Sequence, residues 1–142
     1  MERAFWDSSS LVPLCVRQSA TPKAQSLDVK YPKAVWWCAP VEMQGAFARL
    51  MRIGQLTTSG QVQAQVRLDQ LRRDWQEVEP SEELRERAEE LVDRFPLKAA
   101  DAFQLAAAWK WCLGRPRSRA FICGDAQLLS AARQLGFQGI EA

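Results

Sequence analysis

Short apolar runs alternate with longer amphipathic stretches along this chain. A short apolar run bounded by turn residues is typical of a buried strand. Five such runs, three strongly apolar and two weaker, predict strands at residues 4–6, 34–38, 75–79, 120–123 and 137–141. The amphipathic stretches predict helices over residues 11–16, 41–53, 57–74, 80–95, 97–109 and 126–135. Residues 19–33 hold two prolines and several lysines, which predict a loop with at most a short helix.

The alternation of strands and helices predicts the fold class. It favours an α/β protein, a three-layer α/β/α sandwich with a mainly parallel central sheet of about five strands. The polar content of residues 75–79 suggests an edge strand. No repeat or linker divides the chain, so residues 1–142 are predicted to form a single domain. Right-handed crossovers would bring the carboxyl ends of the strands to one edge, where ligands of such sheets bind.

The predicted helix over residues 97–109 carries an acid within an apolar face. Helical spacing places six residues on that face: Leu97, Ala100, Asp101, Gln104, Leu105 and Ala108. A carboxylate among apolar side chains is costly unless it is paired, hydrogen-bonded or bound to a metal. A structural explanation is also open, because the dipole of a helix favours an acid such as Asp101 in its first turn.

The composition is that of an ordinary globular domain, with 47% hydrophobic and 25% charged residues. The net charge of +2 permits a nucleic-acid partner without arguing for one. No apolar run is long enough to span a membrane, and the N-terminus lacks the pattern of a signal peptide. We therefore expect a cytoplasmic protein that has no membrane partner.

The chain contains no histidine, and none of its four cysteines forms a Cys-x-x-Cys pair. Zinc sites of the usual kind and hydrolysis by Ser-His-Asp or Cys-His groups are therefore not expected. Chemistry would have to come from carboxylates, amines, hydroxyls or a metal held by oxygen.

Four acids occupy positions where such chemistry could gather. Asp7 and Asp125 follow predicted strands, Glu42 opens the helix after another strand, and Asp101 opens the helix that leads to residues 120–123. Taken singly, Asp7 and Asp125 are equally explained as helix caps, and Glu42 as a surface residue. Together they would repel one another, and Mg²⁺ or Mn²⁺ would relieve that repulsion through carboxylate oxygens. Such an ion can activate water against a phosphodiester.

Four segments of the sequence, in chain order, resemble the PIN-domain family: residues 5–12, 41–50, 97–106 and 121–137. The resemblance is closest to the VapC-type toxins, the ribonucleases of bacterial and archaeal toxin–antitoxin pairs. It implies an Mg²⁺- or Mn²⁺-dependent endoribonuclease with Asp7, Glu42, Asp101 and Asp125 as catalytic and metal-binding residues. It also implies a cognate antitoxin and a homodimer, and it matches Ser9 to a hydroxyl that supports the first acid.

The sequence departs from the family pattern in two places. Cys123 stands where many members have Thr or Ser. Ala126 and Gln127 stand where some members carry a further acid, so the number of metal ions, one or two, stays open. Residues 19–33 match no segment of the family.

An RNA substrate would need cations beside the acidic edge. The candidates are Arg49, Arg52 and Lys98, together with the basic turn at 115–119; Arg49 ranks first because it lies two helical turns from Glu42 on nearly the same face. Solvated surface residues are the alternative explanation.

Two other functions compete with the ribonuclease. One is a hydrolase of another substrate, such as a DNA flap or a phosphomonoester, although Asp7-Ser8-Ser9 lacks the Asp-x-Asp of haloacid-type phosphatases. The other is a non-catalytic interaction module on the same fold. Trp109 and Trp111 cannot both face inward, so one of them is predicted to contact a partner.

Overall fold

A computed structural model describes residues 2–142, and within that range the chain forms five strands and seven helices. The strands are β1 (Ala4–Trp6), β2 (Lys33–Trp36), β3 (Gln76–Val78), β4 (Ala120–Cys123) and β5 (Gln138–Glu141). The helices are α1 (Ser8–Cys15), α2 (Thr21–Lys30), α3 (Ala39–Arg52), α4 (Thr58–Asp74), α5 (Glu82–Arg94), α6 (Ala99–Trp111) and α7 (Ala126–Leu135). Among these residues no helix combines the length and the apolar character needed to cross a membrane.

The five strands form one sheet in the order β3-β2-β1-β4-β5, and every neighbouring pair is parallel. The inner strands β1, β2 and β4 are buried along their whole length, as parallel strands covered on both faces must be. The polar strand β3 lies at an edge, as its sequence predicted. Because all strands run the same way, their carboxyl ends meet at one edge.

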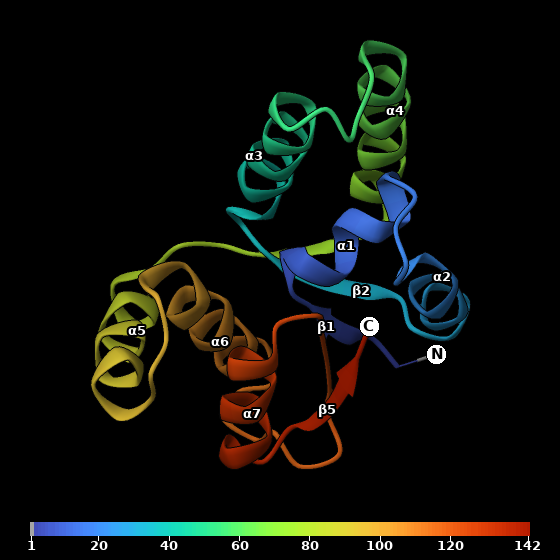
Figure 1. Cartoon of the computed structure of the whole chain (residues 1–142). Helices are drawn as coiled ribbons and strands as arrows, with labels where there is room; N and C mark the ends of the chain where they lie inside the picture. Colours follow the sequence, from blue (N-terminus) through green and yellow to red (C-terminus); the bar gives the residue numbers. More distant parts are fainter. Residues whose placement is uncertain (1) are drawn as a thin grey trace.

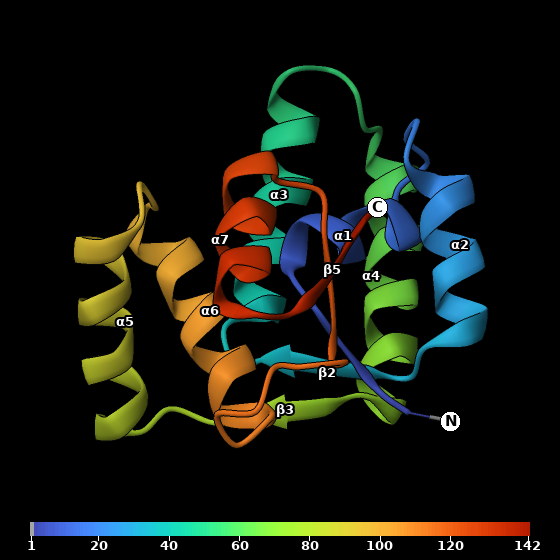
Figure 2. The ribbon, with the colours of Figure 1, turned by 90° about the horizontal axis from the view of Figure 1, so that it is seen from below.

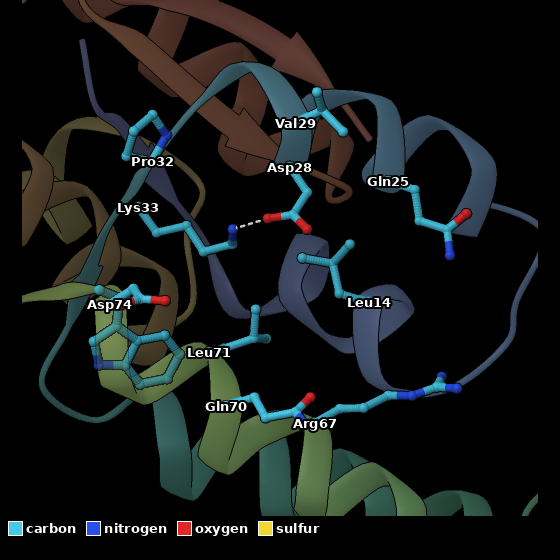
Figure 3. A pocket seen from close by; sticks show the side chains of 11 residues that line it. Leu14, Gln25, Asp28, Val29, Pro32, Lys33, Arg67, Gln70, Leu71 and Asp74 are labelled. Carbon is cyan, nitrogen blue, oxygen red and sulfur yellow. Dashed lines mark hydrogen bonds and ion pairs between the residues drawn. The ribbon is translucent and has the colours of Figure 1, made fainter. Parts of the chain in front are cut away.

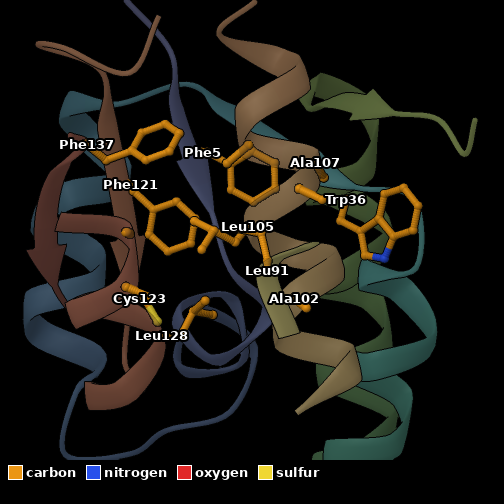
Figure 4. Close-up of a cluster of buried hydrophobic side chains, with 14 of the residues drawn as sticks. Phe5, Trp36, Leu91, Ala102, Leu105, Ala107, Phe121, Cys123, Leu128 and Phe137 are labelled. Carbon is orange, nitrogen blue, oxygen red and sulfur yellow. The ribbon is translucent and has the colours of Figure 1, made fainter. Parts of the chain in front are cut away.

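Helices cover both faces of this sheet (Figures 1 and 2). Successive strand residues point to opposite faces, so Phe5 packs with α5, α6 and α7, whereas Trp6 packs with α1 to α4. Figure 4 shows the first of these clusters, in which the ring of Phe5 stacks on that of Phe121. The predicted three-layer α/β/α sandwich with a parallel five-stranded sheet is therefore confirmed.

The prediction of a loop with at most a short helix over residues 19–33 understated the helix, because α2 fills most of that segment. Pro22 lies in the first turn of α2, where a missing N–H costs no helical hydrogen bond. Thr21 donates to the carbonyl of Pro13 and accepts from the N–H of Gln18, which fixes the start of the helix. Ala24 and Leu27 are buried at helical spacing, so packing stabilises a helix that the prolines seemed to exclude.

Helix α6 begins two residues later than predicted, with Lys98 as its N-cap. It buries Gln104 and Leu105 as predicted, but Ala100 is exposed, so the predicted apolar face was too broad at its start. Ala106 and Ala107 are also buried, because α6 packs against the sheet on one side and α5 on another. Asp101 lies in the first turn.

The two tryptophans of α6 do not divide into one buried and one exposed residue. Trp109 and Trp111 are both half-buried, and the guanidinium groups of Arg87 and Arg119 cover their rings. Neither tryptophan is fully buried, in agreement with their spacing, and a partner contact by one of them stays a prediction. The exposed tryptophan of the described residues is Trp37, at 52%.

Candidate functional site

Asp7 leaves the end of β1 and caps the N-terminus of α1. Its Oδ2 accepts hydrogen bonds from the N–H of Ser9 (3.2 Å), from the hydroxyl of Ser9 and from the thiol of Cys123 (3.5 Å). Asp7 is only 4% exposed, and this burial raises its pKa from 3.8 to about 6. The hydrogen bonds from Ser9 oppose the rise, and the charges of Glu42 and Asp101 add to it.

The Ser9 hydroxyl joins two strand ends. It donates to Asp7 and accepts from the N–H of Gly124 at 2.9 Å, which connects the end of β1 to the end of β4. Cys123 lies beside them, and burial raises the pKa of its thiol, so this sulfur stays neutral in the metal-free protein. The hydrogen bond from its hydroxyl places Ser9 directly beside Asp7.

Glu42 lies in the first turn of α3, where the helix dipole favours a carboxylate. Its Oε1 accepts hydrogen bonds from the hydroxyl of Ser8 at 2.7 Å and from Nε2 of Gln104 at 2.6 Å. Ser8 is the first residue of α1, and Gln104 lies one turn after Asp101 on α6. Three helices are therefore joined at this carboxylate.

Asp101 and Asp125 each open a helix. Asp101 is half-buried, and burial raises its pKa, as do the charges of Asp125 and Glu42, while Lys98 lowers it. Asp125 is exposed and caps α7 by accepting a hydrogen bond from the N–H of Leu128 at 2.9 Å.

The four acids thus lie in one region at the carboxyl edge of the sheet. Asp101 is their common neighbour. Its charge raises the pKa of Asp7, and the charges of Glu42 and Asp125 raise the pKa of Asp101. They form a loose cluster: within residues 2–142 no three His, Cys, Asp or Glu side chains are placed to hold a metal ion together. Binding of one ion by three or more of these acids would require some of the side chains to move closer.

The donor chemistry nevertheless fits a hard cation. Each acid retains at least one carboxylate oxygen that accepts no hydrogen bond from residues 2–142: Asp7 Oδ1, Glu42 Oε2, Asp125 Oδ2 and both oxygens of Asp101. Oxygen donors of this kind suit Mg²⁺ and Mn²⁺.

The predicted RNA-binding cations are placed unequally. The charge of Lys98 lowers the pKa of Asp101, so Lys98 lies beside the cluster. Arg49 and Arg52 are exposed in the last turn of α3, and Arg49 lies about 10 Å along the helix axis from Glu42. The turn at 115–119 lies at the opposite end of β4.

A large cavity lies away from the acidic cluster, since none of the four acids lines it. It has a volume of about 630 Å³, lies between α1, α2 and α4, and holds the ion pair of Lys33 with Asp28 (Figure 3). A cavity of about 430 Å³ does reach the cluster, since Asp125 and Gly124 line it with Arg133 of α7. The carboxylates identify the candidate site better than cavity size does.

Sequence reasoning missed two polar residues of this site, Ser8 and Gln104. Gln104 was recognised only as a member of the same helical face as Asp101, and Ser8 was assigned no role in the site. The sequence did contain a signal for Gln104. It is a polar amide three residues after Asp101, in an otherwise largely apolar stretch of the helix.

No protein-family model and no curated protein sequence matches the chain. Seven chains of solved structures match it in three dimensions, and two of them show the extent of the likeness. A toxin–antitoxin complex from Klebsiella pneumoniae gives a TM-score of 0.61 at 20% identity, over 89% of this chain and 90% of the other. VapBC2 from Rickettsia felis, bound to a DNA fragment from its promoter, gives 0.65 at 12% identity, over 98% of both chains. At these identities the likeness establishes the fold, so this chain has the PIN-like α/β/α fold of the VapC-type proteins that its sequence resembles.

Proposed function

We propose that this protein is a metal-dependent endoribonuclease and the toxin of a toxin–antitoxin pair. The observation that carries the proposal is the gathering of Asp7, Glu42, Asp101 and Asp125 at one sheet edge, with Asp101 within reach of the charges of the other three. Burial is the main cause of the raised pKa values of Asp7 and Asp101, and the charges of the neighbouring acids add to it. A divalent cation would favour the ionised form of both groups.

The four carboxylates are the residues that would hold Mg²⁺ or Mn²⁺. When bound, such an ion supplies an activated water and charge neutralisation at the phosphodiester. The chain's own groups keep the carboxylates in place: Ser9 holds Asp7 between the ends of β1 and β4, and the N-terminus of α3 favours the charge of Glu42. Lys98 lowers the pKa of Asp101 and, as an exposed cation, would meet an RNA phosphate at this site.

The partners follow from the fold and the sequence resemblance. Two of the structural neighbours belong to a toxin–antitoxin complex and to VapBC2. We therefore expect a cognate antitoxin that binds this chain, a homodimer, and action on RNA in the cytoplasm.

The rival functions differ in their predicted use of the acids. A non-catalytic module has no need for four mutually repelling carboxylates, and their presence favours a nuclease. A DNA or flap nuclease would use the same cluster, so the choice between nucleic acids requires a direct comparison.

The test is cleavage of a labelled single-stranded RNA and of DNA of the same sequence, with Mg²⁺, Mn²⁺ or EDTA. We expect wild type to cut the RNA only with a metal, and Asp101→Asn to lose at least about 100-fold in rate, as expected when a charge-stabilising group is removed. Asp93→Asn, an exposed acid of α5, is the matched control and should retain activity. Cleavage that survives EDTA, or equal cutting of DNA, would contradict the proposal.

A further inference from the structure

Gln104 is a buried amide in an otherwise apolar part of α6. It is 1% exposed, and its buried helical neighbours are Ala102, Leu105, Ala106, Ala107 and Ala108. Burying an amide costs free energy that its hydrogen bonds only partly return. A methionine of similar length would fill the same space without that cost, so the polar group calls for a reason other than packing.

The contacts of Gln104 supply that reason. Nε2 donates to the hydroxyl of Ser8 at 2.9 Å and to Oε1 of Glu42 at 2.6 Å. Ser8 in turn donates to the same Oε1 at 2.7 Å. The amide therefore joins α6 to α1 and α3, the helices that open beside Asp101, Asp7 and Glu42 respectively.

Within the described part of the chain, the carbonyl oxygen of the amide lacks a hydrogen-bond donor. Oε1 of Gln104 is buried and accepts no hydrogen bond from residues 2–142. An orphaned buried acceptor is unfavourable for stability. The amide is thus arranged to serve Glu42 and Ser8 rather than to optimise its own hydrogen bonding, and such violations concentrate at functional sites.

We propose that Gln104 is a positioning residue, which together with Ser8 fixes the Glu42 carboxylate by its Oε1 and leaves Oε2 free to bind a cation. A glutamate side chain has several rotatable bonds, and fixing it before the ion arrives removes an entropic cost from binding. The consequence for metal binding and catalysis rests on the proposed function; the placement of Glu42 does not.

Gln104→Met separates positioning from packing, because it keeps the volume and removes both donors while Ser8 can still reach Glu42. Ser8→Ala removes the second donor with a small change in volume and remains informative if Gln104→Met does not fold. Gln63→Met, at an exposed position of α4, is the matched control.

Three measurements on these proteins test the proposal. In metal-free crystals the wild-type Glu42 carboxylate should contact Ser8 and Gln104, and in Gln104→Met it should leave that position. By calorimetry, Gln104→Met should bind Mn²⁺ about 10-fold to 100-fold more weakly, the usual effect of removing a hydrogen bond to a ligand. Ser8→Ala should weaken binding in the same direction, while melting temperatures and the KM for RNA stay near wild type.

The results distinguish this inference from the proposed function. If Glu42 keeps its place in Gln104→Met, or if both variants bind Mn²⁺ as wild type does, the positioning role is overturned even when RNA is cleaved. If wild type neither binds Mn²⁺ nor cleaves RNA, the proposed function fails, and the crystal structures alone decide whether Gln104 positions Glu42. Loss of binding that only follows a lowered melting temperature, with Glu42 unmoved, would indicate a structural role and overturn the proposal.

Discussion

Replacing Asp7 by asparagine should stabilise the metal-free protein while abolishing its proposed activity. Asp7 is 4% exposed, and burial raises its pKa from 3.8 to about 6. In the unfolded chain the same carboxyl group ionises near its ordinary pKa of 3.8. Between these two pH values the folded state binds the extra proton, so stability falls as the pH rises through this window. Above about pH 6 the full cost of the buried charge is present.

That cost is about 3 kcal/mol, because one pKa unit corresponds to about 1.4 kcal/mol. Asparagine has nearly the same shape as aspartate, stays neutral and can still cap α1. In EDTA near pH 8 the Asp7→Asn variant should melt about 6–12 °C above wild type, at the usual 2–4 °C per kcal/mol for a domain near this size. At about pH 4 the difference should fall below about 1 kcal/mol, because wild-type Asp7 is then protonated in the folded state.

Thermal unfolding followed by circular dichroism over this pH range measures both quantities. Asp93→Asn makes the same chemical change on an exposed part of α5 and should stay within about 0.5 kcal/mol of wild type. A variant at Asp7 that is no more stable than wild type near pH 8 would refute the reasoning. A stability gain that persists unchanged to pH 4 would also refute it.

Three further predictions concern the cations and the assembly. Arg49→Ala should weaken RNA binding and lower its salt slope by about one, whereas Arg72→Ala on α4 should not; equal slopes in a salt titration would place the RNA elsewhere. Lys98→Ala should raise the pKa of Asp101, because Lys98 now lowers it, so the acidic limb of the pH–rate profile should move to higher pH; an unmoved limb would count against a role for Asp101 as an ionised group. Light scattering at micromolar concentration should give a homodimer, and a monomer alone would remove that expectation.

The fold could be predicted because its signals are local. Apolar runs such as 120–123 become fully buried strands, and the alternation of strands with helices leaves few arrangements open. The helix α2 could not be predicted in this way. Its prolines lie in its first turn and beyond its end, and its stability comes from burying Ala24 and Leu27, which depends on partners far along the chain.

The candidate site could likewise be predicted where its signals are local, and not where its contacts join distant parts of the chain. Asp7 and Asp125 could be placed because Asp7 directly follows β1 and Asp125 lies two residues after the end of β4, and parallel strands bring their carboxyl ends together. The contacts of Glu42 could not be foreseen, since Ser8 and Gln104 lie 34 and 62 residues away in sequence. The spacing of the acids was also beyond the sequence, because side-chain rotamers decide whether neighbouring carboxylates form a cage or the loose cluster seen within residues 2–142.

The central claim is that the four carboxylates act as one metal-binding unit, and anomalous diffraction from crystals soaked in Mn²⁺ tests it most directly. The account predicts one or two Mn²⁺ peaks within about 2.0–2.5 Å of carboxylate oxygens, the usual range for hard cations, with Asp7 and Asp101 both among the ligands. It also predicts that the Asp101 and Asp125 side chains move toward Asp7 when the ion binds. A map at saturating Mn²⁺ that holds no peak beside Asp7, in crystals whose cluster is open to solvent, would contradict the claim.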